Sequence, residues 1–239
     1  MAVARQLVFL CAVMAVIPLS ARAGDPDILT DFVVPATVNP SDVNGTFFTY
    51  GHLVNGVDPD PATFNVTKAT AAEFPALLGQ SVSYASLVYG AGTANPPHLH
   101  PRASELLLVV KGALFVGLVD AARNGSVYTQ ALEAGDMFVF PKGMVHFQFN
   151  NGSGEARALS AFGSANPGTV SLPKALFGAG IDEAVLEKSF HVGADVIAEL
   201  EHDNGMPAAP PAPAPSSSSA ASLGGAAMLA CLATAWFFA

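Results

Sequence analysis

Short apolar runs alternate with turn residues through the middle of this chain. The runs are rich in residues that favour strands, and they span 81–88, 105–110, 113–119, 126–132, 136–140, 145–150 and 156–161. Turn signals separate them, and the pair Asn124-Gly125 favours a tight hairpin because both residues tolerate a positive φ. Strands that follow one another without intervening helices are typical of an antiparallel sandwich or barrel. The pattern therefore predicts an all-β domain.

The apolar positions change their spacing after the last predicted strand. Three short helices are expected there, over 173–177, 182–190 and 195–201. Leu186 and Phe190 give the second helix one apolar stripe, while Asp182 and Asp195 are suitable N-caps. These helices can cover their own barrel or another subunit, and the residues alone leave both arrangements open.

Four side chains among the predicted strands could bind a metal ion. His98 and His100 are two positions apart, so on a strand they project from the same face. Glu105 opens the next apolar run, and the turn residues before it let that strand fold back toward the two histidines. His146 lies about forty positions further along. Three imidazoles and one carboxylate suit a divalent ion with positions left open for water or substrate. The alternative is that all four are ordinary polar residues of loops, because a lone His-x-His pair is a weak signal.

Side-chain parity within the predicted strand at 145–150 offers a test of this site. His146 and Gln148 share one face, whereas Phe147 and Phe149 share the other. If His146 points into the barrel, both phenylalanines face outward against a second layer, a subunit or local loops. Three further histidines have no partner pattern and are expected at surface or loop positions: His52, His191 and His202.

The candidate ligands belong to two longer spaced patterns. The first is Gly92-x5-His98-x-His100-x4-Glu105-x6-Gly112, and the second is Gly135-x5-Pro141-x-Gly143-x2-His146-x3-Asn150. Together they resemble the two cupin motifs in the form found in plant germins and germin-like proteins, and the resemblance extends over roughly 25–201. It implies a cupin double-sheet jelly-roll barrel with short C-terminal helices, and a homo-oligomer built as a trimer of dimers. It also implies a bound Mn²⁺ ion with four ligands: His98, His100, Glu105 and His146.

The resemblance further indicates which chemistry to expect. Germins are oxalate oxidases, and several germin-like proteins resemble superoxide dismutases in activity. Two pocket asparagines help germins to bind oxalate; one matches Asn95, whereas the other falls at Ala85. A missing hydrogen-bond donor weakens substrate binding. Superoxide dismutation is therefore favoured over oxalate oxidation, with a small anionic or oxygen-species substrate. The alternative is a non-enzymatic cell-surface binding or receptor-like protein of the auxin-binding type.

The N-terminal segment 1–23 reads as a secretory signal. Arg5 precedes an apolar run, and Ala21-Arg22-Ala23 forms a small-residue cleavage site. A membrane anchor is the alternative, but the run is short. Cleavage would place the protein in the apoplast or cell wall and shift its formal charge from −9 to about −11. Nucleic acid is excluded as a partner on this charge. An acidic surface also gives no steering to an anionic substrate, so the metal is expected to supply all of the attraction.

The two cysteines lie outside the domain expected over 24–203. Cys11 belongs to the signal segment and Cys231 to the C-terminal tail. Germins usually carry a disulfide near the mature N-terminus, so this chain departs from the family pattern there. That departure leaves the structure of 24–57 open.

The C-terminal part has two compositions. Residues 204–222 are rich in Pro, Ala and Ser and are expected to form an extended stalk. Residues 223–239 are apolar, without a flanking Lys or Arg, and shorter than a usual membrane-spanning helix. They fit a removable glycosylphosphatidylinositol (GPI) anchor signal with attachment near Ser217, which would tether the domain to the outer leaflet. A retained tail helix or a poorly ordered extension is the alternative.

Four Asn-x-Ser/Thr sequons become usable if the chain is secreted. They begin at Asn44, Asn65, Asn124 and Asn151. Asn65 is the favoured glycan site, because germin-like proteins often carry a glycan at this place. Asn151 directly follows the second motif and is expected to be too closely packed for modification.

Overall fold

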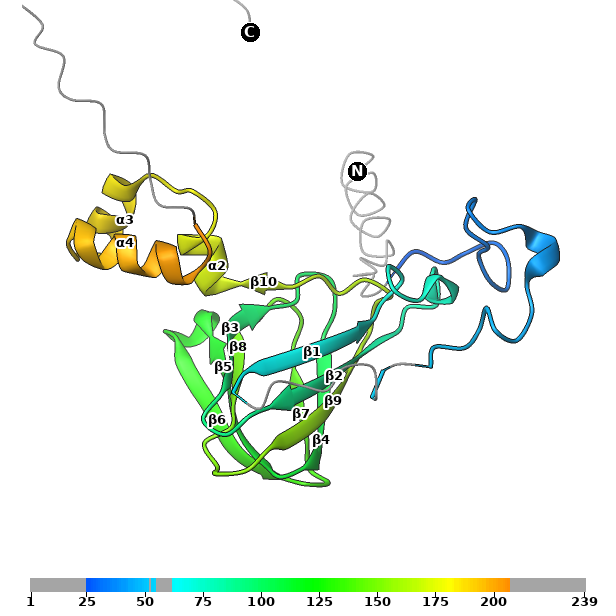
Figure 1. The fold of residues 1–239 in the computed structure, drawn as a ribbon, viewed down its shortest axis with the longest axis horizontal. Coiled ribbons are helices and arrows are strands. Elements are labelled where there is room, and N and C mark those ends of the chain that lie inside the picture. The colour runs from blue at the N-terminus through cyan, green and yellow to red at the C-terminus, as the bar shows by residue number, and fades with distance from the viewer. Residues whose placement is uncertain (1–24, 52, 55–61, 207–239) are drawn as a thin grey trace, which may run out of the picture.

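A computed structural model describes residues 25–51, 53–54 and 62–206, and it shows two antiparallel sheets facing each other (Figure 1). The first sheet has the order β1-β2-β9-β4-β7 and the second the order β10-β3-β8-β5-β6. Strands of the first sheet are β1 (Phe64–Ala69), β2 (Ser83–Tyr89), β9 (Ala156–Phe162), β4 (Glu105–Lys111) and β7 (Met137–Phe140). Strands of the second are β10 (Val170–Ser171), β3 (Ala94–Leu99), β8 (His146–Phe149), β5 (Ala113–Asp120) and β6 (Ser126–Glu133).

The predicted all-β double-sheet barrel is confirmed. All seven predicted runs became strands, β2 and β4 to β9, with ends displaced by no more than two residues. The apolar pattern did not identify β1, which mixes apolar and polar residues, or the short β10. It also passed over β3, where Pro96 and Pro97 interrupt the run; the pairing of β3 with β8 shifts register between Asn95 and His98, as expected where prolines remove backbone donors.

The apolar core fills the space between the two sheets. Every second residue of β9 is buried, and the same alternation runs along β4, as a strand with one face on a core requires. The largest cluster of buried apolar residues contains Leu87, Tyr89, Leu107, Val109, Leu114, Val116, Leu118, Leu132, Phe140, Ala156 and Ala158. This core rigidly sets the spacing of the sheets on which the candidate ligands lie.

The parity prediction for β8 is also confirmed. His146 and Gln148 are buried in the barrel, whereas Phe147 and Phe149 are half-buried on the other face. Phe147 lies over Gly117 of the neighbouring β5, where an added Cβ would approach the ring to 2.6 Å. Glycine at that position therefore lets the phenylalanine cover its own sheet.

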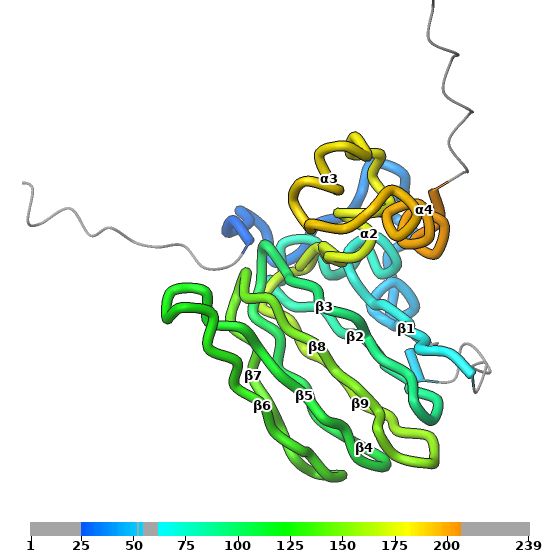
Figure 2. Tube along the Cα trace, turned by 90° about the vertical axis from the view of Figure 1, so that its left-hand side faces the viewer, coloured from blue at the N-terminus to red at the C-terminus, as the bar shows by residue number. Residues whose placement is uncertain are grey.

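Three helices follow the barrel and project from one side of it (Figures 1 and 2). They are α2 (Leu172–Phe177), α3 (Glu183–Phe190) and α4 (Ala194–Asp203). Asp182 caps α3 as predicted, because its Oδ1 accepts from the backbone N–H of Ala184 at 3.0 Å. The N-cap predicted at Asp195 is wrong: α4 begins one residue earlier with Gly193 as its N-cap, so Asp195 lies within the first turn. A carboxylate in the first turn still stabilises the helix, because it interacts favourably with the positive end of the helix dipole.

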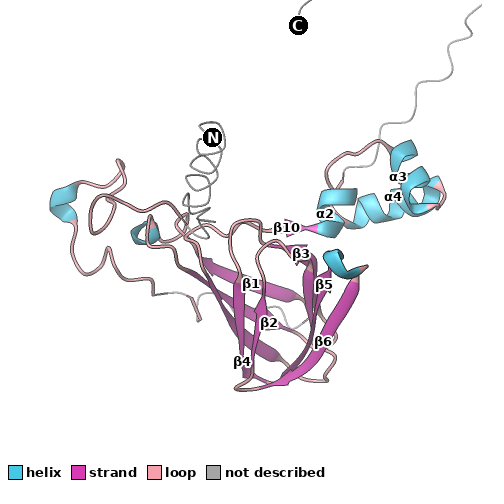
Figure 3. Ribbon diagram, turned by 180° about the vertical axis from the view of Figure 1, so that it is seen from behind, coloured by secondary structure: helices cyan, strands magenta, loops and turns pink. Residues whose placement is uncertain are grey.

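Short 3₁₀ turns, at η1 (Pro40–Asp42), η2 (Pro75–Leu77) and η3 (Ala121–Arg123), complete the secondary structure of the described residues (Figure 3). The segment 25–51 lies on the opposite side of the barrel from the helices (Figures 1 and 3). Asp25 fastens it, with its carboxylate accepting from Ser164 Oγ at 2.5 Å and Ala165 N at 2.6 Å. These contacts hold a segment that has no cysteine to form a disulfide.

The sequons differ in their surroundings. Asn44, Asn124 and Asn151 are exposed, and Asn65 is half-buried in β1. The expectation that Asn151 is closely packed is wrong, because it lies in the open turn after β8. Its neighbour Asn150 is the buried residue, and donates to the carbonyls of Tyr89, Gly90 and Gly154.

Several predictions concern residues outside the described ranges. These are the signal segment, the attachment site at Ser217, the apolar tail and His52. Of the other two unassigned histidines, both His191 and His202 are exposed, as expected. Within the described part of the chain, no helix is both long and apolar enough to span a bilayer.

Candidate metal centre

The four predicted ligands meet between the two sheets near one end of the barrel. His98 lies in β3, His100 directly after that strand, Glu105 at the start of β4 and His146 at the start of β8. His98 and His146 are cross-strand partners in the second sheet, whereas Glu105 reaches them from the first. One potential ligand atom from each residue lies within 4.8 Å of all the others, and all four side chains are buried. The four predicted ligand residues therefore lie together in one buried cluster.

Backbone carbonyls orient all three imidazoles. His98 Nδ1 lies 2.8 Å from the oxygen of Pro96, His100 Nδ1 lies 2.6 Å from that of Gly168, and His146 Nδ1 lies 2.8 Å from that of Met144. A carbonyl only accepts, so each Nδ1 carries a hydrogen and donates it. In a neutral ring the lone pair is then on Nε2. Such a carbonyl partner is the usual means of fixing a metal-binding histidine.

Glu105 faces two of these Nε2 atoms. Its Oε2 lies 2.9 Å from His100 Nε2 and 3.1 Å from His146 Nε2. With the ring hydrogens on Nδ1, the nitrogen lone pairs would face carboxylate lone pairs at these distances. Protonating both buried rings relieves the repulsion, but places two cations side by side. A divalent cation relieves it with neutral rings, so the donor set fits the Mn²⁺ ion implied by the family resemblance.

The electrostatic environment keeps the ligands in their metal-binding forms. Burial, followed by the neighbouring His146, lowers the pKa of His98 to about 4, so its ring is neutral at pH 7. Burial alone raises the pKa of Glu105. When the rings of His100 and His146 are protonated, their Nε2–H groups donate to the carboxylate, and this outweighs burial and holds the pKa of Glu105 well below its ordinary value of 4.5. Glu105 is therefore ionised. Metal ligands need these deprotonated forms.

A hydroxyl group that sequence reasoning missed supports the carboxylate. Ser160 of β9 is buried, and its Oγ donates to Glu105 Oε1 at 2.5 Å. The available signal was parity: Ser160 shares the inward face of β9 with Ala156, Ala158 and Phe162. A polar residue on an otherwise apolar inward face needs a partner.

Aromatic rings pack against the imidazoles. Phe140 stacks on His146 with ring centroids 4.3 Å apart and an angle of 18° between the planes. The ring of Phe162 meets His100 edge to face at 4.8 Å. These contacts limit ring rotation and keep bulk water from one side of the site.

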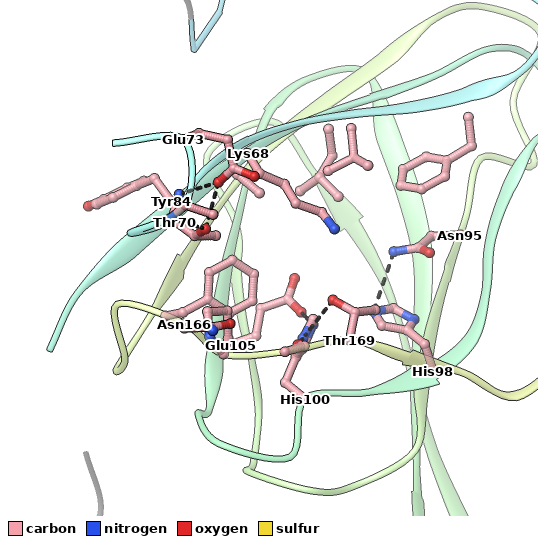
Figure 4. Close-up of a pocket in the computed structure, with 18 residues that line it drawn as sticks. Lys68, Thr70, Glu73, Tyr84, Asn95, His98, His100, Glu105, Asn166 and Thr169 are labelled. Carbon is pink, nitrogen blue, oxygen red and sulfur yellow. Dashed lines mark hydrogen bonds and ion pairs between the residues drawn. The ribbon is translucent and has the colours of Figure 1, made fainter. Parts of the chain in front are cut away.

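A cavity of about 280 Å³ adjoins three of the ligands, His98, His100 and Glu105 (Figure 4). Its walls include the apolar side chains of Phe64, Val66, Leu87 and Phe162, and the polar side chains of Lys68, Asn95 and Thr169. The predicted substrate-binding residue Asn95 lies in the wall, with Nδ2 3.4 Å from His98 Nε2. Ala85 also lines the cavity and offers it no polar side-chain atom.

The double-sheet barrel and its site of three histidines and one glutamate define the class of protein as a cupin. In agreement, a family model described as Cupin matches residues 56–198. The chain is 68% identical over 199 residues to germin-like protein 9-1 of Oryza sativa subsp. japonica, across 83% of this chain and 79% of the relative. It is 57% identical to putative germin-like protein 9-2 of the same rice, across 82% and 92%.

Solved structures agree with these relatives. An oxalate oxidase in complex with the substrate analogue glycolate superposes with a TM-score of 0.69 at 34% sequence identity, covering 76% of this chain and 98% of that one. An oxalate decarboxylase formate complex from Lactobacillus farciminis is 24% identical with a TM-score of 0.51, covering 56% of this chain and 38% of that one, and shows the shared fold alone. The chain belongs to the germin-like proteins of the cupin family.

Proposed function

We propose that this germin-like protein is secreted, binds Mn²⁺ and catalyses superoxide dismutation, with little oxalate oxidation. The observation that carries the proposal is the buried cluster in which three oriented Nε2 atoms and the ionised Glu105 converge beside an open cavity. Dismutation converts two superoxide anions and two protons into dioxygen and hydrogen peroxide. When bound, manganese would supply the one-electron redox chemistry that this conversion requires.

The chain's own residues contribute orientation and access. Carbonyl partners hold His98, His100 and His146 with their Nε2 atoms toward one point. Glu105 brings one negative charge, which leaves a divalent centre with net positive charge and supports attraction of a small anion. The Asn95 amide in the cavity wall can donate to such an anion. The apolar walls restrict access to small molecules.

The cavity is less suited to oxidation of oxalate. An oxalate oxidase is among the similar structures, and the resemblance to germins implies that the second pocket asparagine of germins falls at Ala85. Ala85 is buried and lines the cavity, so its methyl group stands where the amide would donate. Loss of a donor to a charged group costs about 1.5–3 kcal/mol of binding. Oxalate would therefore bind weakly and without fixed orientation.

The experiment is a metal analysis followed by two activity assays. The secreted full chain, expressed with excess manganese, should contain one Mn²⁺ per subunit by elemental analysis. It should dismutate superoxide and turn over oxalate poorly, and Ala85→Asn should raise oxalate turnover at least about tenfold. The control is Ala158→Asn, which adds the same amide on β9 within the apolar core cluster and should not raise it. Absence of bound metal would refute the metal centre, and efficient oxalate oxidation by the unchanged protein would refute the role given to Ala85.

Other segments of the chain support the proposed location and assembly. Segment 1–23 supports secretion to the apoplast or cell wall, and 223–239 supports a GPI anchor. The exposed apolar side chains Val185, Phe190 and Val196 on the projecting helices support the homo-oligomer, a trimer of dimers, that the family resemblance implies. Light scattering of the purified protein tests this: a monomeric mass would refute the assembly.

A further inference from the structure

A lysine lies in the wall of the cavity, where neither the metal motif nor the net charge predicts one. Lys68 belongs to β1 and is the cross-strand partner of Ala85 on β2. Paired residues of antiparallel strands project from the same face, and both residues line the cavity. Figure 4 shows the side chain extending into the cavity, toward the side on which Asn95 lies. The position that lacks an amide on β2 thus has a cation directly opposite on β1.

The charge of Lys68 is not neutralised by an ion pair. Among the described residues, no carboxylate forms a salt bridge with its Nζ. Two acids line the cavity, Glu73 and Glu105, and the positive charge of Lys68 helps to lower the pKa of Glu73. The carboxylate of Glu73 is already engaged, however, because it accepts from Thr70 N at 3.0 Å and from Thr70 Oγ1 at 2.6 Å.

Lys68 is exposed to solvent, and apolar side chains flank it along the cavity wall. On β1, the neighbouring cavity-facing positions are Phe64 and Val66, and Leu87 of β2 continues this apolar wall. Apolar walls keep water from one side of the cation, so its field toward the cavity acts through a lower effective dielectric than in open water. Among the residues that line the cavity, Lys68 is the one lysine or arginine, and it lies with the carboxylates of Glu73 and Glu105 in a chain whose formal charge is −9.

We propose that Lys68 is an anion-binding residue of this cavity, acting with the Asn95 amide on a small anion such as a monocarboxylate or superoxide. The proposal rests on the proposed function, because it takes the cavity to be the substrate site of the metal centre. A lysine ammonium is a compact charge on a flexible stem, so it selects ligands by charge. It does not impose the fixed orientation that a second amide would give to oxalate. This residue thus favours small anions as a class while leaving oxalate poorly positioned.

The test measures binding rather than turnover. Glycolate is titrated calorimetrically into the manganese-loaded full chain at low and high salt, with neutral glycolamide as the comparison ligand. Lys68→Met should weaken glycolate binding about tenfold at low salt, with a smaller difference at high salt. Lys68→Arg keeps the charge and should retain most of the affinity. Glycolamide affinity should be the same in all variants.

The matched control is Lys188→Met, which removes one exposed lysine from α3 and should leave glycolate binding unchanged. Equal glycolate affinity in the wild type and Lys68→Met overturns the proposal, as does an equal loss in Lys188→Met or no glycolate binding by the wild type. Manganese content and melting temperature verify that each variant is folded; Lys68→Gln replaces Lys68→Met if the latter loses its metal. If the wild type does not dismutate superoxide but Lys68→Met weakens glycolate binding as expected, only the proposed function is refuted. If dismutation is normal but Lys68→Met does not change glycolate binding, only this proposal is refuted.

Discussion

Substitution of Ser160 by alanine tests whether the support behind Glu105 controls metal binding. The serine hydroxyl donates to Glu105 Oε1, while Glu105 Oε2 faces His100 and His146. Ser160→Ala removes one hydroxyl and leaves every proposed ligand in place. It also leaves one oxygen of an ionised carboxylate without its partner in the interior.

The expected magnitude follows from the burial of this contact. The two oxygens are 2.5 Å apart, and both side chains are buried, so water cannot readily replace the hydroxyl. A hydrogen bond to a charged group contributes about 1.5–3 kcal/mol. Loss of an outer partner of a metal ligand typically lowers metal affinity by about 10–100-fold. We therefore expect the Mn²⁺ dissociation constant to rise at least about tenfold.

Competition against a fluorescent chelator measures that constant, and urea unfolding of the metal-free protein measures the effect on stability. Ser83→Ala is the matched control, because Ser83 is equally buried but its Oγ donates to the carbonyl of Ser164 at 2.7 Å. The control should lose about 1 kcal/mol of unfolding free energy and keep its manganese affinity. Unchanged affinity in Ser160→Ala, or an equal loss in both variants, would refute the role assigned to Ser160.

Three further predictions concern the ligands and the tail. His100→Ala should bind no manganese by elemental analysis and, because metal stabilises only the folded state, should lose the roughly 5–10 °C rise in melting temperature that a saturating metal gives. Metal-free protein should lose up to about 3 kcal/mol of unfolding free energy on acidification from about pH 6.5 to pH 4. Burial lowers the pKa of His98 to about 4 in the folded state, so over this pH range the unfolded state binds one more proton than the folded state. His98→Gln should remove most of this pH dependence, as measured by urea titrations. If the tail is exchanged for a lipid, phosphatidylinositol-specific phospholipase C should release the protein from membranes, and the mature chain should lack Trp236, its only tryptophan; a Trp236-containing peptide in mass spectra of the mature protein would refute the anchor.

The sequence predicted those parts of the fold that depend on local pattern. Alternating apolar positions located seven strands, and the two spaced motifs identified the four residues that the structure brings together as candidate ligands. Strand β3 was harder, because Pro96 and Pro97 remove donors and shift the register. The structure places His98 within that strand but His100 just beyond it. Both still reach the site, since the loop carbonyl of Gly168 orients His100 from outside the strand.

Contacts between strands distant in sequence could not be predicted in the same way. Ser160 supports Glu105 because β9 lies beside β4, with Phe162 opposite Glu105. An inward serine was visible from parity, but its partner depended on strand order. Lys68 was hidden for the same reason: its strand mixes polar and apolar residues, and its proximity to Ala85 requires the pairing of β1 with β2.

Net charge was a poor guide to the cavity for a related physical reason. A formal charge of −9 sums over the whole chain, and from it the metal was expected to provide all attraction for an anion. The potential inside a narrow cavity depends instead on the nearest charges, because water and salt screen the distant ones within about 10 Å. Lys68 lines the cavity together with Glu73 and Glu105, whereas the other acidic side chains of the described residues do not line it. An acidic protein can therefore place a cation beside its ligand. Glycolate binding that weakens with salt in the wild type, but not in Lys68→Met, would distinguish the contribution of this lysine from attraction by the metal alone.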